Sequence, residues 1–384
     1  MTDLHNPFRP GPTRRIAGGL LAASSILPGG ASALDQMNMS EGVTELSRIM
    51  YDFHMIMLTL VTVVAVGVFA VMFYSVFTHR KKDGEKPADF HESTTLEVIW
   101  TAIPFVVLVV LAFPATKAIL TIEDTGDPDM TIQATGYQWK WKYDYLDDDI
   151  SFFSNLDAKS NEARQKDSGI DPATVENYLL DVDNPMVVPI NKKVRILTTA
   201  SDVVHSWWVP ELGVKRDGVP GFINESWMRV EKEGTYRGQC AELCGKDHGF
   251  MPIVVVAKTE ADYQKWVAEQ KQAQQAEAAA ADQDLTKEEL LARGEKAYLT
   301  SCGACHMPNG EGTGPFPPLK GSPSVDGPTV EHIKTVLNGK GNMMPPFAAQ
   351  LNDLDIAAII TYERNAWGTG AGDVVQSAQV KAAR

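Results

Sequence analysis

An uncharged run of 22 residues, Ile56 to Phe77, constrains the fold of this chain more than any other feature of its sequence. As a helix it is long enough to cross about 30 Å of hydrocarbon, and the core of a water-soluble protein rarely has such a helix. A second uncharged run of 19 residues, Val98 to Thr116, contains Pro104 and Pro114. We therefore predict a two-helix transmembrane hairpin. Its boundaries are residues 34–120, with spans at about 53–77 and 97–116.

Basic residues are unevenly distributed around these two runs. The outer flanks have only Arg48 and Lys117 nearby. The connecting loop carries Arg80, Lys81, Lys82 and Lys86. Because loops rich in Lys and Arg stay in the cytoplasm, the predicted hairpin has its loop inside and its two ends outside.

The first residues of the chain have the features of an export signal. Arg14 and Arg15 precede a short apolar stretch, and Ala31, Ser32 and Ala33 fit the small-residue rule for cleavage. We predict a signal peptide over residues 1–33 and a protein of the bacterial plasma membrane, with its later domains on the periplasmic side. The formal charge of −14 argues against a nucleic-acid partner and suits a basic redox partner, although a solvated acidic surface explains it equally well.

The segment CAELCGKDHGFM holds an unusual density of soft metal ligands. It contains Cys240, Cys244, His248 and Met251, and His205 lies upstream in a strand-like run. Thiolate, imidazole and thioether groups form the set that copper prefers in electron-transfer sites. Two alternatives stay open on these residues alone. One is a tetrahedral zinc site, for which methionine is an odd ligand, and the other is a buried disulfide beside an incidental histidine.

From Met130 onward, short runs of β-branched and aromatic residues alternate with Gly, Pro and Asp turns. This pattern indicates an all-β sandwich. A long polar insertion, residues 146–184, interrupts the strands, and we expect a short helix in it around Pro172 to Leu180.

Three stretches, VVHSWWVP, GQCAELCGKDHGFMPIVV and GYQWKWKYDY, resemble the CuA domain of cytochrome c oxidase subunit II. The resemblance implies a cupredoxin-like Greek-key sandwich over residues 128–258, with a dinuclear copper centre held by loops at one end. Residues 259–285 are expected to be a linker. Its first half resembles the helix that closes the CuA domain, and its Gln- and Ala-rich remainder is helical or disordered. The ligands implied by the resemblance are His205, Cys240, Glu242 through its backbone carbonyl, Cys244, His248 and Met251.

The resemblance also gives roles to two further groups. Trp139 matches the exposed tryptophan through which electrons enter CuA. Trp139 and Trp141 are two positions apart and are expected on the same face of a strand, with Trp141 in the core. The family commonly has an aromatic residue where this chain has Lys140. In the family, the carboxylate that corresponds to Glu242 points to a magnesium or manganese ion shared with subunit I.

Glu97, at the start of the second span, has two open interpretations. A carboxylate at the edge of a span is usually a boundary residue. In the family, the glutamate in this stretch lies at the entrance of a proton channel into subunit I.

A second cofactor motif lies near the C-terminus, after a helix that Thr286 and Glu289 begin as a capping box. Cys302, Cys305 and His306 form C-x-x-C-H, in which two thiols add to the haem vinyl groups and the histidine reaches the iron. A thioredoxin-like redox pair is the alternative, but it needs a βαβ context that the sequence lacks.

The sixth ligand of this haem has two candidates, Met343 and Met344. The resemblance to class I cytochrome c favours Met344, which directly precedes proline in M-P-x-F, and leaves Met343 to packing. The carbonyl of Pro317 or Pro318 is the expected partner of the free N–H of His306. The predicted all-α cytochrome c domain covers residues 286–370, and 371–384 is a tail without a pattern. The last predicted helix is expected to pack on the helix before the haem motif through Ile356, Ile359, Ile360 and Tyr362.

The predicted fold class is a multidomain membrane protein with a helical hairpin, a cupredoxin-like sandwich and a cytochrome c domain. The resemblance implies subunit II of a haem–copper cytochrome c oxidase, with a cytochrome c domain fused to it. Electrons from an external donor, such as a cytochrome c or a quinol-oxidising complex, are expected to pass to haem c, to CuA and to subunit I, which reduces oxygen and pumps protons. Subunit III and membrane lipid are further expected partners.

Three other classes of protein share parts of this pattern. A quinol oxidase subunit lacks the copper ligands, and a nitrous-oxide-reducing enzyme lacks this membrane hairpin. A membrane-anchored CuA and haem c electron relay outside a terminal oxidase stays open.

Overall fold

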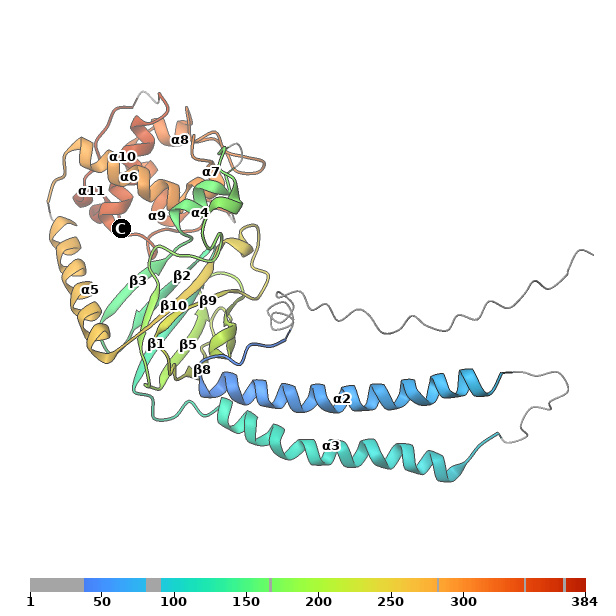
Figure 1. Ribbon diagram of the computed structural model, residues 1–384. Coiled ribbons are helices and arrows are strands. Elements are labelled where there is room, and N and C mark those ends of the chain that lie inside the picture. The colour runs from blue at the N-terminus through green and yellow to red at the C-terminus, as the bar shows by residue number, and fades with distance from the viewer. Residues whose placement is uncertain (1–37, 81–90, 166–167, 282, 342, 369–370) are drawn as a thin grey trace, which may run out of the picture. The chain divides into compact units, whose positions relative to one another are not determined.

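The computed structural model describes residues 38–80, 91–165, 168–281, 283–341, 343–368 and 371–384. Figure 1 follows the course of the chain, and residues Gly42–Arg384 form one compact unit. The predicted signal peptide and most of the basic hairpin loop, including Lys81, Lys82 and Lys86, lie outside the described residues.

Two long helices, α2 (Glu45–Thr78) and α3 (Thr94–Ile122), lie side by side as an antiparallel hairpin (Figure 1). Each contains one predicted span and continues beyond it, and both are long and apolar enough to cross a membrane. Their apolar side chains face outward, as is required where the solvent is lipid. Pro104 and Pro114 lie inside α3.

The outer ends of this hairpin are fixed to the β domain. Thr44 caps α2, and its hydroxyl also donates to the Leu212 carbonyl at 2.8 Å. At the end of α3, the indole of Trp227 donates to the Thr121 carbonyl at 3.1 Å. These contacts explain why both helices extend past their predicted spans on the side of the sandwich.

The β domain is a sandwich of two five-stranded sheets, in the orders β3-β2-β1-β5-β8 and β4-β10-β9-β6-β7. Its largest fully buried side chains include Trp141 and Trp207. The sandwich accounts for the alternating residue pattern of the strands, because successive side chains of a strand face the core and the outside in turn. The strands are β1 (Met130–Tyr137), β2 (Lys140–Tyr145), β3 (Ile150–Ser154), β4 (Met186–Pro189), β5 (Val194–Ala200), β6 (His205–Val209), β7 (Val214–Gly218), β8 (Asn224–Met228), β9 (Gly234–Cys240) and β10 (Pro252–Lys258).

The polar insertion contains a short helix, α4 (Ala158–Ala163), that the sequence analysis did not predict. Asp157 caps it with its carboxylate. The helix expected around Pro172 to Leu180 is only a 3₁₀ turn, η1 (Pro172–Thr174). Two further 3₁₀ turns lie in the sandwich, η2 (Pro210–Leu212) and η3 (His248–Phe250).

The linker is helical through most of its length, as α5 (Glu260–Ala281). Near its start Trp266 packs on Tyr145, with ring centroids 5.1 Å apart. Near its end Glu277 forms an ion pair with Arg293 of the C-terminal domain. The helix is therefore attached to both domains.

The C-terminal domain is all-α, and its longest helices cross closely. A Cβ on Gly294 of α6 would lie 2.0 Å from the Ala358 carbonyl of α10, so only glycine permits this crossing. Leu354 and Ala358 pack toward Leu290 of α6, as does Tyr362 toward Tyr298. The helices are α6 (Lys287–Ser301), α7 (Gly303–His306), α8 (Pro323–Asp326), α9 (Thr329–Asn338), α10 (Asp353–Asn365) and α11 (Ser377–Ala383).

Two details of this domain differ from expectation. Ile356 and Ile360 pack in a cluster with residues of α9 and α11, not on α6. The segment 371–384 is not a featureless tail, because Val375 and Val380 are fully buried in the same cluster. The C-terminal helix thus completes the core of the domain.

Candidate metal centres

The six predicted copper ligands meet at one end of the sandwich. His205 begins β6, Cys240 ends β9, and the loop to β10 brings the rest to them. The Cys240 sulfur lies 3.9 Å from the Cys244 sulfur, 3.9 Å from His205 Nδ1 and 3.4 Å from the Glu242 carbonyl oxygen. The Cys244 sulfur lies 3.5 Å from His248 Nδ1 and 3.5 Å from Met251 Sδ.

This donor set fits two soft metal ions better than one. Each sulfur has one imidazole nitrogen and one weaker donor beside it, and six donors exceed the four of a tetrahedral zinc site. At 3.9 Å the sulfurs are also too far apart for a disulfide, and both cysteines are free thiols. Thiolates, imidazoles and a thioether form the copper set.

Hydrogen bonds prepare this cluster for a metal. The hydrogen bond from Cys244, with a further one from His205, lowers the pKa of the Cys240 thiol. This shift favours the thiolate, which is the form that binds metals. Burial lowers the pKa of His205, but hydrogen bonds to Asp202 and Cys240 outweigh it, and the net shift is upward.

Asp202 is a functional residue that the sequence analysis missed. Its Oδ1 lies 2.9 Å from His205 Nε2, and its Oδ2 accepts from the backbone N–H of Gln138 at 2.8 Å. A carboxylate on one imidazole nitrogen fixes the tautomer and leaves the other nitrogen to the metal. The only signal was an acidic residue three positions before the histidine.

Trp139 lies in the two-residue turn between β1 and β2, not on a strand beside Trp141 as predicted. Its indole Nε1 donates to the Cys244 carbonyl at 3.2 Å, and the Gln138 amide donates to the same oxygen at 2.8 Å. Gly245, with a φ of +118°, lets the loop turn against the indole ring. The turn thus holds Trp139 on Cys244, a predicted copper ligand, whereas Trp141 is in the core as expected.

Lys140, next to Trp139, is buried. Its Nζ lies 4.6 Å from the centroid of the Phe153 ring. Burial lowers the pKa of this ammonium to about 8, because the charged form loses its water.

This burial predicts a rise of stability with pH. An unfolded lysine keeps its proton to about pH 10.4, whereas the folded chain releases it near pH 8. Between these values the unfolded state binds more protons, so the free energy of unfolding increases with pH. At pH 7, Lys140→Met should stabilise the metal-loaded periplasmic part by about 2 kcal/mol, after allowance for the lost cation–π contact. Thermal unfolding of the variant and the parent from pH 7 to 10 checks this. If the free energy of unfolding changed with pH in the same way in both proteins, the prediction would be contradicted.

The haem motif is held by α6 and α7. Cys302 and Cys305 are free thiols, and His306 Nδ1 lies 2.9 Å from the Pro317 carbonyl, one of the two predicted partners. With Nδ1 as the donor, Nε2 is free to bind iron, so the residues fit a covalently attached haem.

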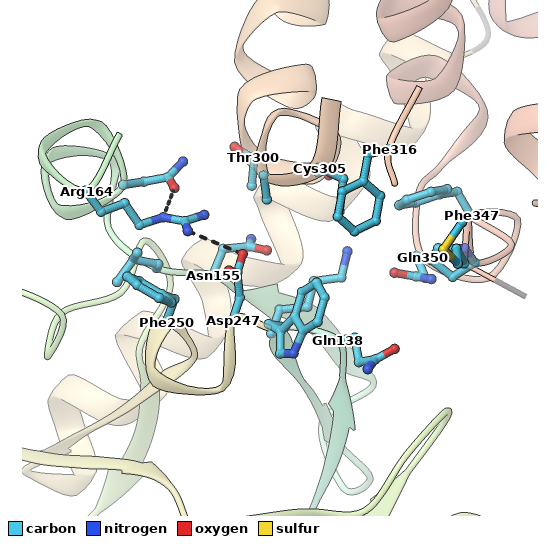
Figure 2. A pocket seen from close by; sticks show the side chains of 18 residues that line it. Gln138, Asn155, Arg164, Asp247, Phe250, Thr300, Cys305, Phe316, Phe347 and Gln350 are labelled. Carbon is cyan, nitrogen blue, oxygen red and sulfur yellow. Dashed lines mark hydrogen bonds and ion pairs between the residues drawn. The ribbon is translucent and has the colours of Figure 1, made fainter. Parts of the chain in front are cut away.

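A pocket lies beside this motif and reaches to the loop between β9 and β10 that carries predicted copper ligands, here called the copper-ligand loop (Figure 2). Cys305, Phe316 and Phe347 line one side in this view, and Asp247 and Phe250 line the other. Trp139 and Lys140 also line the pocket.

The two methionine candidates for the haem lie differently. Met343 lines the pocket and is 60% exposed. Met344 is half-buried and packs against the cluster around Ile333. Which of the two sulfurs binds the haem iron stays a prediction.

Matched substitutions distinguish the two methionines. Met344→Leu should remove the low-spin, methionine-ligated haem spectrum, because leucine has no donor atom. Met343→Leu should keep it. Absorbance spectra of the reduced and oxidised protein show whether methionine ligation is kept. Loss of the spectrum in Met343→Leu, with the spectrum kept in Met344→Leu, would assign the ligand to Met343 instead.

Two other predicted residues are exposed. Glu97 lies in the first turn of α3. The Glu242 side chain lies in a shallow pocket with Asp217 and Asn224. The structure brings Glu97 to none of the other predicted site residues.

The sequence matches three family descriptions. Residues 32–118 match the transmembrane domain of cytochrome C oxidase subunit II, and residues 130–258 match its periplasmic domain. Residues 289–362 match subunit III of the cbb3-type cytochrome C oxidase.

Individual proteins agree with these matches. The chain is 39% identical over 234 residues to the probable cytochrome c oxidase subunit 2 of Rickettsia bellii, covering 61% of this chain and 83% of that protein. It is 36% identical over 220 residues to cytochrome c oxidase subunit 2 of Cereibacter sphaeroides, covering 55% and 72%. A crystal structure of the periplasmic domain of cytochrome oxidase subunit II of Bradyrhizobium japonicum shares 39% identity, covers 39% of this chain and 98% of that one, and has a TM-score of 0.34.

The three family matches cover the hairpin, the sandwich and residues 289–362 of the C-terminal domain. The chain belongs to the cytochrome c oxidase subunit II family and carries a cytochrome c domain at its C-terminus.

Proposed function

We propose that this chain accepts electrons at its own cytochrome c domain and delivers them through Trp139 to a dinuclear copper centre, and from there to subunit I. One observation carries this proposal. Trp139 lines the same pocket as Cys305 of the haem motif, and its indole donates to the carbonyl of Cys244. A single side chain therefore borders the pocket beside the haem-binding motif and also contacts the copper-ligand loop.

The residues that would hold the two cofactors are those predicted from the sequence. Cys302 and Cys305 would attach haem c, and His306 and Met344 would bind its iron. When bound, haem and copper supply two one-electron redox centres. The six clustered donors would hold copper at the end of a rigid sandwich, so that little would have to move when the charge changes. The copper ligands would be His205, Cys240, Glu242, Cys244, His248 and Met251.

The metal and haem content of the purified chain tests this proposal. We expect two copper ions and one haem per chain, with haem retained on a denaturing gel. One zinc ion per chain, or haem that is lost on denaturation, would contradict it. Co-purification with a large haem-bearing subunit I excludes the alternative of an electron relay outside a terminal oxidase.

We also propose that the chain sits in a bacterial plasma membrane with its metal domains on the periplasmic side, next to subunits I and III, and that it serves a proton-pumping oxidase. Arg80, two residues after the end of α2 that is away from the sandwich, supports this orientation. Labelling of single cysteines placed at each end of the hairpin tests it. Labelling of the loop from the periplasm would contradict it.

Glu242 is proposed to take part in a second metal site with subunit I. Its exposed carboxylate lies near Asp217, and carboxylates suit Mg²⁺ or Mn²⁺. In complex prepared with manganese, Glu242→Gln should remove the manganese signal in paramagnetic resonance but keep the copper signal. An unchanged manganese signal would contradict this assignment.

Glu97→Gln tests the proposed role of Glu97 in proton uptake. An amide cannot donate and recover a proton, so oxygen consumption by the assembled complex should slow while copper is still reduced at the normal rate. If Glu97 is only a boundary residue, turnover stays unchanged. A defect in both rates would point to faulty assembly of the hairpin with subunit I.

A further inference from the structure

The loop that carries the copper ligands touches the haem motif directly. Lys246 lies between Cys244 and His248, and its Nζ donates to the Ala304 carbonyl at 2.9 Å. Ala304 lies between the two haem cysteines. The same ammonium is 5.2 Å from the centroid of the Phe316 ring. One lysine therefore joins the two cofactor motifs.

The polar insertion makes a second connection at the same place. Arg164, at the end of α4, pairs with Asp247 at 3.3 Å and stacks over the Phe250 ring, with 4.5 Å to its centroid (Figure 2). The side chains of Arg164 and Asp247 are only 14% and 5% exposed. Arg164 thus binds the insertion firmly to the copper-ligand loop.

The insertion also reaches the C-terminal domain. Asn161 accepts from Arg164 Nε at 2.8 Å and donates from Nδ2 to the Leu299 carbonyl at 3.4 Å. Leu299 is in the last turn of α6, where carbonyls lack partners within the helix and carry partial negative charge. Donors from the sandwich therefore meet acceptors at the end of the helix that leads into the haem motif.

We propose that Lys246, Arg164 and Asn161 form a latch that orients the chain's own cytochrome c domain on the copper-ligand loop, with Lys246 as a positioning residue for electron transfer. This proposal rests on the proposed function. The helix α5 is attached to both domains and limits their separation, whereas the latch sets which edge of the cytochrome c domain faces Trp139. The polar insertion, for which the sequence suggested no role, supplies Arg164 and Asn161 to this latch.

The test uses the assembled oxidase with the full chain. A ruthenium dye photoreduces the haem, and absorbance follows the reduction of copper. Lys246→Ala loses one charge-assisted hydrogen bond and should slow this transfer about tenfold. Arg164→Ala should slow it similarly, and Lys246→Arg should restore it to within about twofold of the parent, because arginine keeps a charged donor. The matched control is Lys232→Ala, an exposed lysine of the same domain, which should leave the rate unchanged.

The copper and haem spectra of each variant separate positioning from a structural defect. Both spectra should match the parent in Lys246→Ala. A parental rate in Lys246→Ala would overturn the latch and leave the proposed function standing. Loss of the copper signal in that variant would also overturn it, because Lys246 would then build the metal site. Absence of haem-to-copper transfer in the parent itself would instead refute the proposed function.

Discussion

Cys244→Ser should abolish the dinuclear copper centre. The Cys244 sulfur lies within 3.5 Å of both His248 and Met251 and 3.9 Å from Cys240, so its loss removes the atom that joins these donors. A hydroxyl is a poor substitute for a thiolate at a soft metal. Paramagnetic resonance of the mixed-valence state should lose the signature of an electron shared by two coppers.

The control for this result is Met251→Leu. A thioether is a weak ligand, so this variant should keep its copper but change the potential of the site. Cys240→Ser should behave as Cys244→Ser does. A shared-electron signal in either serine variant would contradict the assignment of both thiolates to the copper centre.

Trp139→Leu should slow the reduction of copper by the haem about a hundredfold, the typical cost of losing a group that must be accurately placed. The indole lines the pocket beside Cys305 and donates to the Cys244 carbonyl. The Gln138 amide does the same, but of these two side chains only the indole is aromatic. Leucine removes the ring and the N–H together. Flash photoreduction of the haem measures the rate.

Trp139→Phe is the matched variant, because it keeps a ring but loses the hydrogen bond to Cys244. Its rate should fall between those of Trp139→Leu and the parent, and the copper spectrum should stay unchanged in both variants. A parental rate in Trp139→Leu would show that electrons take another path.

The predicted fold class is confirmed. It could be predicted from the sequence because local patterns determine its three parts. An uncharged run such as Ile56 to Phe77 has few alternatives to a membrane helix. Alternation along strands such as β5 reports burial on one face. The capping box at Thr286 predicts the start of α6 correctly.

Features that depend on tertiary contacts could not be predicted in this way. The helix α4 is too short for periodicity, and its importance comes from Arg164, whose partner Asp247 is 83 positions away. The helix α11 is stabilised by burial of Val380 against α9 and α10, which the local sequence does not reveal. The prediction that Trp139 lies on the same strand as Trp141 was wrong, because a two-residue turn separates β1 from β2 and contains Trp139.

In the candidate site, too, the local sequence predicted some residues and missed those that depend on tertiary contacts. A dense motif indicated its ligands, and the structure gathers them within contact distance. The supporting shell was not visible in the sequence. Asp202 on His205, and the turn that holds Trp139 on Cys244, both depend on how β1 and β6 lie in the folded sandwich.

Time-resolved electron transfer within the assembled oxidase tests the central claim most directly. After photoreduction of the haem of this chain, its reoxidation and the reduction of copper should proceed at one common rate. That rate should not depend on the concentration of the complex, because donor and acceptor belong to the same chain. A rate proportional to concentration, or copper reduced while the haem stays reduced, would contradict electron delivery through this chain's own cytochrome c domain.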